Sequence, residues 1–286
     1  MAEFLLSSFA DEASPMLDEQ FAASKKHGFR YIEVRGVDEK NIADYTAEEA
    51  KELARRFADA GIGVSSLGSP FGKIDITEDP TEHFEKMKRG LEIANILGTQ
   101  RVRLFSFFIP KGEDPDAYRE PVLERMDKMA DLCKEAGILC CHENEKDIYG
   151  DSLKRVLDLL TTFEGRICGV FDPANFIQCG EDTLTAFKTL YPYLDYVHIK
   201  DCTADGTIVP AGKGEGHIEE ILTLYAQKEG PRFITLEPHL MEFAGLAGLE
   251  KDGVSMLHHA YTFENNQQAF DFAADALKEI VDRIQQ

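Results

Sequence analysis

Leu139-Cys140-Cys141-His142-Glu143-Asn144 is a short apolar run that ends in charged and polar residues. The pattern recurs three times downstream, at intervals of roughly 25 to 40 residues, which is about one strand-plus-helix unit of a (β/α)8 barrel. The recurrences are Phe171-Asp172-Pro173, His198-Ile199-Lys200-Asp201 and Leu236-Glu237-Pro238-His239. Because such a barrel brings the C-terminal ends of its strands to one face, Glu143, Asp172, His198 and Glu237 are expected to converge. Three carboxylates and one imidazole suit a divalent metal ion.

Eight strand-like segments alternate with helical patterns along the chain. They are short, apolar and rich in β-branched or aromatic residues. The expected strands are Phe4–Ala10, Tyr31–Arg35, Gly63–Leu67, Val102–Phe107, Leu139–Glu143, Cys168–Asp172, Tyr196–Lys200 and Phe233–Glu237. Strict alternation indicates a parallel sheet, and eight units favour closure over an open sheet. We therefore predict an α/β fold, with one (β/α)8 TIM-barrel domain spanning residues 1–286.

Local signals mark where the helices begin and end. Ser14-Pro15 predicts an N-cap followed by proline at the first helical position, and Thr46-Ala47-Glu48-Glu49 has a capping-box pattern. Later helices are expected at residues 80–98, 116–137, 151–165, 182–191, 217–230 and 264–284. The glycine-rich GxGxxG turn of a dinucleotide-binding half is missing after the first strand, which again favours the barrel.

The charge of the chain excludes whole classes of partner. With 52 acidic and 31 basic residues the net charge is −21, so no excess of Lys and Arg exists to neutralise nucleic acid or an anionic membrane. There is no transmembrane run, and the N-terminus lacks the features of a signal peptide. The six cysteines form no CxxC pair and are expected to be reduced. These features predict a cytoplasmic protein that acts on a small molecule.

The motifs also resemble a known family. They are Glu143-Asn144, Phe171 to Phe176 followed by Gly180, His198 to Asp201, Gly212 to Gly216, and Leu236-Glu237. In order and spacing they are similar to the xylose isomerase-like barrels, in particular the sugar phosphate isomerase/epimerase group that includes the ketose 3-epimerases. The resemblance implies that Glu143, Asp172, His198 and Glu237 bind one divalent ion, often manganese. It also implies that Glu143 and Glu237 form an acid/base pair.

Two departures from the family pattern bear on the substrate. Asn175 stands where many members have histidine, and Cys202, Thr203 and Ala204 stand where some ketose epimerases carry an arginine. The metal-binding residues are unaffected by both departures. Manganese is favoured, with magnesium, cobalt or zinc as alternatives, because oxygen-rich sites with one imidazole discriminate poorly between metals.

These residue types suit proton transfer beside a carbonyl. A metal on the carbonyl and hydroxyl oxygens of a sugar stabilises the enediolate that forms when the neighbouring proton leaves. Two carboxylates on opposite faces can remove a proton from one face and return one to the other. We therefore expect a metal-dependent isomerase or epimerase of a ketose or sugar phosphate. The main alternative is a lyase that dehydrates a keto-inositol or dihydroxy acid; an endonuclease IV-like phosphodiesterase and a non-catalytic sugar-binding barrel are further readings.

Further residues are candidates for contact with the substrate. Asn175, Lys200, Arg103 and His239 are expected at or near the ends of strands and are predicted to bind it. His142 is a candidate for a base or for a residue that supports a metal ligand. Glu33 and Arg35, at the end of the second strand, are expected to form a buried ion pair. The loop Gly212-Lys213-Gly214-Glu215-Gly216 could bind phosphate, but Glu215 would repel an anion, which favours an uncharged sugar.

The segment from Leu240 to Thr262 has no clear periodicity and follows the strand that carries Glu237. A connection of this length in a compact domain is usually functional. We predict that it covers the bound substrate or packs against a second subunit of a homo-oligomer.

Overall fold

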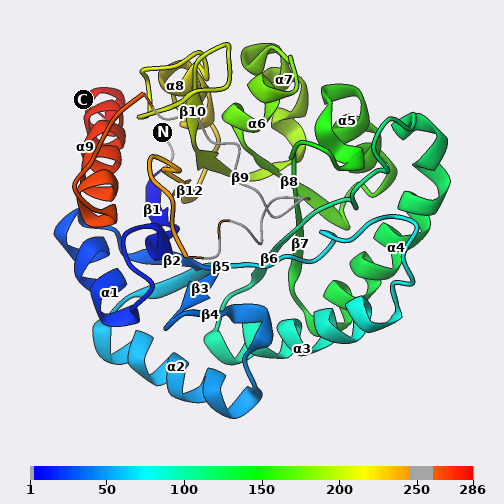
Figure 1. Ribbon diagram of the computed structural model, residues 1–286, viewed down its shortest axis with the longest axis horizontal. Helices are drawn as coiled ribbons and strands as arrows, with labels where there is room; N and C mark the ends of the chain where they lie inside the picture. The colour runs from blue at the N-terminus through cyan, green and yellow to red at the C-terminus, as the bar shows by residue number, and fades with distance from the viewer. Residues whose placement is uncertain (1–2, 245, 247–259, 286) are drawn as a thin grey trace.

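Eight parallel strands close into a barrel in a computed structural model that describes residues 3–244, 246 and 260–285 (Figure 1). The order around the barrel is β1-β12-β9-β8-β7-β6-β5-β2, and β1 pairs with both β2 and β12. The strands are β1 (Phe4–Ser8), β2 (Tyr31–Val34), β5 (Gly63–Gly68), β6 (Arg101–Leu104), β7 (Leu139–Glu143), β8 (Ile167–Phe171), β9 (Leu194–Ile199) and β12 (Arg232–Leu236). The predicted TIM barrel is confirmed.

Helices surround the barrel, and the last helix lies beside the first (Figure 1). They are α1 (Leu17–Lys26), α2 (Ala47–Ala60), α3 (Thr81–Leu97), α4 (Arg119–Ala136), α5 (Leu153–Thr162), α6 (Pro173–Gln178), α7 (Thr183–Leu190), α8 (Ile218–Tyr225) and α9 (Asn266–Gln285). Among the described residues, no helix is long and apolar enough to cross a membrane.

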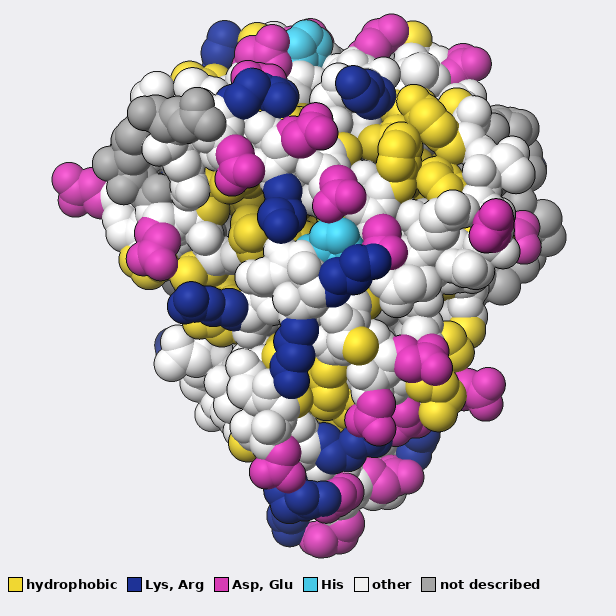
Figure 2. Space-filling model, turned by 90° about the vertical axis from the view of Figure 1, so that its left-hand side faces the viewer, with side chains coloured by type: hydrophobic (Ala, Val, Ile, Leu, Met, Phe, Trp, Pro, Cys, Tyr) yellow, Lys and Arg dark blue, Asp and Glu magenta, His cyan; other side chains and the backbone are white. Residues whose placement is uncertain are grey.

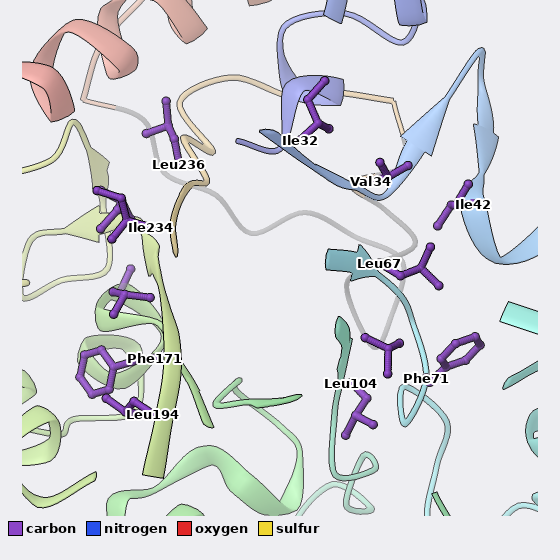
Figure 3. Packing of buried hydrophobic residues seen from close by; sticks show 14 of the residues in the cluster. Ile32, Val34, Ile42, Leu67, Phe71, Leu104, Phe171, Leu194, Ile234 and Leu236 are labelled. Atoms are coloured by element: carbon purple, nitrogen blue, oxygen red, sulfur yellow. The ribbon is translucent and has the colours of Figure 1, made fainter. Parts of the chain in front are cut away.

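Alternation along each strand separates the apolar core from the polar interior of the barrel. In β2, Ile32 and Val34 join the hydrophobic core between sheet and helices, and Glu33 between them turns to the barrel axis. Figure 3 shows Ile32 and Val34 with other apolar side chains of this core. The same alternation in β7 puts Cys140 in the core and leaves Glu143 at the end of the inward-facing set. The inward-facing residues therefore include the apolar cluster of Cys141, Val170 and Tyr196 as well as the charged Glu33 and Glu143.

Some local predictions need correction. Ser14 is not an N-cap, because the first helix begins at Leu17 and Met16 occupies the cap position. The hydroxyl of Ser14 instead bonds to Glu19 and to the Met16 amide. The helix expected over 217–230 ends at Tyr225. The capping box at Thr46 and Glu49 is present as predicted.

Two small antiparallel hairpins extend the strand ends. They are β3 (Gly36–Val37) with β4 (Lys40–Asn41), and β10 (Asp201–Cys202) with β11 (Ile208–Val209). Acidic and basic side chains are interspersed over the face in Figure 2. Most of the segment 240–262, for which we predict a role at the mouth, lies outside the described residues.

Candidate active site

The four predicted ligands meet at the C-terminal mouth of the barrel. Glu143 ends β7, while Asp172, His198 and Glu237 lie at or just beyond the ends of β8, β9 and β12. One ligand atom from each residue lies within 4.8 Å of every other. All four side chains are buried, with at most 3% of each residue exposed. Four polar groups from four strands are therefore held together in a place where water cannot readily solvate them.

The donor set fits a divalent ion. Ligand atoms bonded at about 2.1 Å to one octahedral ion lie roughly 3 to 4 Å apart, so this cluster needs only a small contraction. Asp172 Oδ2 and Glu237 Oε2 are buried and accept no hydrogen bond. The ammonium of Lys200 lies 2.8 Å from the first oxygen and 3.5 Å from the second. Two carboxylate oxygens thus have unused acceptor capacity at the centre of the cluster.

Glu143 and Glu237 have the same pattern of contacts. One oxygen of each approaches His198 Nδ1, at 2.8 Å for Glu143 and 3.2 Å for Glu237. The second oxygen of each accepts from an arginine: Arg103 Nη1 lies 2.8 Å from Glu143, and Arg35 Nη1 lies 3.2 Å from Glu237. Each glutamate therefore turns one oxygen toward the cluster and the other toward a guanidinium, and only Glu143 is hydrogen-bonded at both oxygens.

Glu33 holds His198 from its other side. Glu33 Oε2 lies 3.2 Å from His198 Nε2, and the Tyr196 hydroxyl donates to Glu33 Oε1 at 2.8 Å. A metal ion that displaced the proton from Nδ1 would leave the Nε2 proton with Glu33, and the Nδ1 lone pair would then be directed at the cluster. Glu33 was expected to form an ion pair with Arg35, but its contacts are with His198 and Tyr196, and Arg35 turns to other carboxylates.

Burial and charge separate the pKa values of the acids. Burial raises the pKa of Asp172 to about 7, although Lys200 favours its ionised form. Burial acts the same way on Glu143, but His198 and Arg103 outweigh it and lower the pKa of Glu143 to about 2. Burial disfavours the charged form of His198, yet Glu143 and Glu33 raise its pKa well above the ordinary value. Burial also acts against the charged form of Glu237, but Lys200 and His239 lower its pKa well below the ordinary value, so both glutamates are ionised.

The four predicted substrate-binding residues all line one cavity at the mouth, together with Glu237. Asn175 is largely committed to structure, since its Nδ2 donates to the Asn144 carbonyl at 2.9 Å. Lys200 faces Asp172, and Arg103 faces Glu143. His239 contacts Glu12 at 3.1 Å and lies 3.8 Å from Glu237. His142 lies elsewhere, with its Nε2 2.9 Å from the Ser106 hydroxyl, and is not part of the cluster.

The glycine loop after β9 does not have free amides for a phosphate. The backbone N–H groups of Gly212, Gly214 and Gly216 donate to the Asp201 carboxylate at 2.8 to 3.0 Å. The Asp201 carboxylate therefore occupies the position at which the sequence suggested a bound phosphate. Asp201, the acidic residue directly after Lys200, could have indicated this arrangement in the sequence. Its separation from the glycine loop along the chain hid the pairing.

A second group of carboxylates, which the sequence did not reveal, surrounds Arg35. Arg35 Nε and Nη2 donate to the two oxygens of Asp11 at 2.9 and 3.0 Å, and Nη2 also reaches Glu12 at 3.1 Å. Its guanidinium lies between the rings of Phe9 and Phe243, 4.3 and 4.5 Å from their centroids. These acids lie between the first strand and the first α-helix, where no motif in the sequence pointed to them.

The closed (β/α)8 barrel and the carboxylate–histidine cluster at its mouth place the protein among TIM barrels with a candidate metal centre. The family model described as xylose isomerase-like TIM barrel matches residues 21–250, and the chain belongs to this family. No curated protein matches the sequence.

Three solved structures illustrate the similarity. L-ribulose 3-epimerase has a TM-score of 0.71 at 19% identity, with 100% of this chain and 97% of that chain covered. The IOLI protein, solved with a bound zinc atom, has a TM-score of 0.74 at 15% identity, with 98% of each chain covered. AsbF from Bacillus anthracis, described as a probable 3-DHS dehydratase, has a TM-score of 0.72 at 16% identity, with 97% of this chain and 99% of that chain covered. At such identities the likeness establishes the fold alone.

Proposed function

We propose that the protein is a divalent-metal-dependent isomerase or epimerase of a ketose or sugar phosphate. The observation that carries the proposal is the matched pair of glutamates, each with one oxygen at His198 and the other at an arginine. Glu143, Asp172, His198 and Glu237 would hold the ion, and manganese is favoured for this donor set. When bound, the ion would supply Lewis-acid stabilisation of negative charge on the substrate oxygens.

The chain's own residues supply the proton transfers. Glu143 and Glu237 approach from different strands, so a sugar held between them would present opposite faces to the two carboxylates. One glutamate would remove the proton beside the carbonyl, and the other would return a proton to the opposite face. Their low pKa values make proximity and orientation, not basicity, the main source of rate. The buried position of the pair would limit the access of bulk water to the enediolate.

Solvent exchange in D2O tests the proposal. The manganese-loaded protein, incubated with a panel of ketoses and ketose phosphates, is expected to place deuterium on the carbon beside the carbonyl, as read by NMR. Glu143→Gln and Glu237→Gln are each expected to lower epimerisation at saturating metal by at least about a hundredfold, the typical loss of a general acid or base. Glu120→Gln, on the exposed surface of α4, is the control for handling and folding.

Different outcomes of this experiment separate the candidate functions. Deuterium exchange that survives in only one of the two glutamine variants would assign one face of the sugar to each glutamate. Full epimerisation by both variants would overturn the proposal. Water loss from a keto-inositol or dihydroxy acid, with no deuterium entering any ketose, would assign the protein to the lyases instead.

A further inference from the structure

Arg103 has a buried hydrogen-bonding edge with no partner in the described part of the chain. Its Nη1 donates to Glu143, but Nε and Nη2 are buried and make no hydrogen bond. These two groups form the edge of a guanidinium that binds a planar oxyanion through two parallel hydrogen bonds. Buried N–H groups without partners are unfavourable, so this edge, like the oxygens of Asp172 and Glu237 that accept no hydrogen bond, marks unused hydrogen-bonding capacity at the site.

Other arginines of the chain show what this edge normally binds. The Nε and Nη2 atoms of Arg35, Arg55 and Arg119 each grip both oxygens of one carboxylate, at distances of 2.6 to 3.0 Å. Their partners are Asp11, Glu52 and Asp158. Arg103 is as buried as Arg35 but has no such carboxylate. An oxyanion of the same chemical kind would satisfy both N–H groups of this edge at once.

The surroundings of Arg103 favour a ligand at this edge. Its guanidinium packs against the rings of Phe105 and Phe9, with centroids at 4.6 and 5.4 Å, so these contacts hold the side chain in place and leave the hydrogen-bonding capacity of Nε and Nη2 unused. Lys73 brings a second cation to the same Phe105 ring, at 4.4 Å. Both cations line the mouth cavity, together with Lys200 and the carboxylates Glu145 and Glu237, and Lys73 pairs with Glu145 at 3.2 Å. The nearest carboxylate, Glu143, is already bound by His198 and by Arg103 Nη1.

We propose that Arg103 binds a carboxylate or phosphate group of the substrate through Nε and Nη2. This inference rests on the proposed function, because it places the anionic group in the same cavity as the acid/base pair. The substrate is then a sugar acid or sugar phosphate. This differs from the uncharged sugar that we expected from Glu215 in the sequence. Since Arg103 also holds Glu143, binding of the anion is coupled directly to the orientation of one member of the acid/base pair.

A matched series of substrates tests the proposal. D-fructose, D-fructuronate and D-fructose 6-phosphate differ only at C6, and an equivalent tagatose series covers the other configuration at C4. The manganese-loaded protein is expected to exchange deuterium into one anionic member with a higher kcat/KM than into its neutral counterpart. Preference for the uronate or for the phosphate identifies which oxyanion is bound.

Arg103→Lys keeps a positive charge near Glu143 but removes the two-donor edge. It is expected to lower the ratio of anionic to neutral kcat/KM by roughly tenfold to a hundredfold, the range for charge-assisted hydrogen bonds. Arg101→Lys is the control, because Arg101 lies two residues earlier on the same strand and pairs with Asp195. An unchanged ratio in Arg103→Lys, or a preference for the neutral sugars, would overturn the inference and leave the proposed function standing.

A binding measurement keeps the two proposals separable. If no compound of either series exchanges deuterium, the proposed function fails for these sugars, and the anion site is judged by titration of metal-free protein with inorganic phosphate. Wild-type protein and Arg101→Lys are expected to bind phosphate at least tenfold more tightly than Arg103→Lys. Equal affinities in all three proteins would refute the site, whatever the result with the sugars.

Discussion

His198 illustrates how a residue at the centre of the site depends on one from a distant strand. Glu33 is fully buried on β2 and has no solvent to satisfy its charge, so its position is fixed by Tyr196 and His198. A carboxylate at Nε2 favours the tautomer in which Nδ1 is unprotonated, and it raises the basicity of that nitrogen. Glu33 therefore acts on the metal site through His198, as a positioning residue.

Changing Glu33 is expected to weaken metal binding. Glu33→Ala removes the acceptor for Nε2 and should lower the affinity for Mn2+ by about tenfold to a hundredfold, while Glu33→Gln keeps an acceptor and should lose less. Tyr196→Phe removes the hydroxyl that donates to Glu33 but leaves the contact between Glu33 and His198, so it serves as the milder control. Metal titration monitored by calorimetry measures all three, with circular dichroism to check the fold. Wild-type affinity in a folded Glu33→Ala protein would contradict this role.

For individual residues, the sequence predicted which side chains lie at strand ends, but it did not predict which side chains from different strands contact each other. Glu143, Asp172, His198 and Glu237 could be found because each follows its own apolar run, and closure of the barrel does the rest. The partners of Arg35 and Arg103 could not be found, because they depend on the register between strands and on side-chain direction. Asp11 and Glu237 are separated by most of the chain, yet both bond to Arg35.

Among the elements, the loop from Gly212 to Gly216 is held by a single carboxylate. Asp201→Ala would leave three backbone N–H groups without an acceptor, and we expect it to lower the free energy of unfolding by about 2 to 4 kcal/mol. The control is Asp205→Ala, an exposed residue of the same excursion whose contacts are local. Urea denaturation measures both variants. Equal stability of the two would show that the amides find other partners.

The start of α3 is expected to be sensitive to acid. His83 accepts a hydrogen bond from the Gly72 amide at 2.7 Å, and burial together with Lys86 and Arg125 lowers its pKa to about 4. The neutral form is favoured in the folded state, so its stabilisation is complete above about pH 6.5 and is lost as the pH falls toward 4. The loss amounts to about 3 kcal/mol at most.

His83→Gln tests this dependence, since glutamine can accept the same hydrogen bond but does not titrate. The difference in unfolding free energy between wild type and variant should change steadily between pH 6.5 and pH 4, with wild type losing more. Parallel pH profiles would place the acid sensitivity elsewhere in the molecule.

Element boundaries followed the local signals closely, with instructive exceptions. Leu139–Glu143 was predicted at both ends, and most other strands shifted by one to three residues because backbone pairing, not composition, sets where a strand stops. The hairpins β3–β4 and β10–β11 were missed, since two-residue strands are too short for a periodic pattern.

In the molecule as a whole, the four proposed ligands all come from one continuous half of the barrel. They come from the ends of β7, β8, β9 and β12, which are successive neighbours around the sheet. An ion held by all four would link these strands at their C-terminal ends, and its binding energy would appear as folding stability because the unfolded chain has no preformed site.

Metal removal is therefore expected to lower the thermal stability of the whole domain. At a free Mn2+ concentration of a hundred times Kd the folded state gains about 2.7 kcal/mol, which corresponds to a Tm increase of roughly 5 to 10 °C for a chain of this size. Asp172→Ala should abolish the increase, and Asp205→Ala, which removes an exposed carboxylate outside the cluster, should retain it. Calorimetric scans with and without a chelator measure the shift. A Tm that is the same in EDTA and in excess Mn2+ would mean that the cluster does not bind this ion.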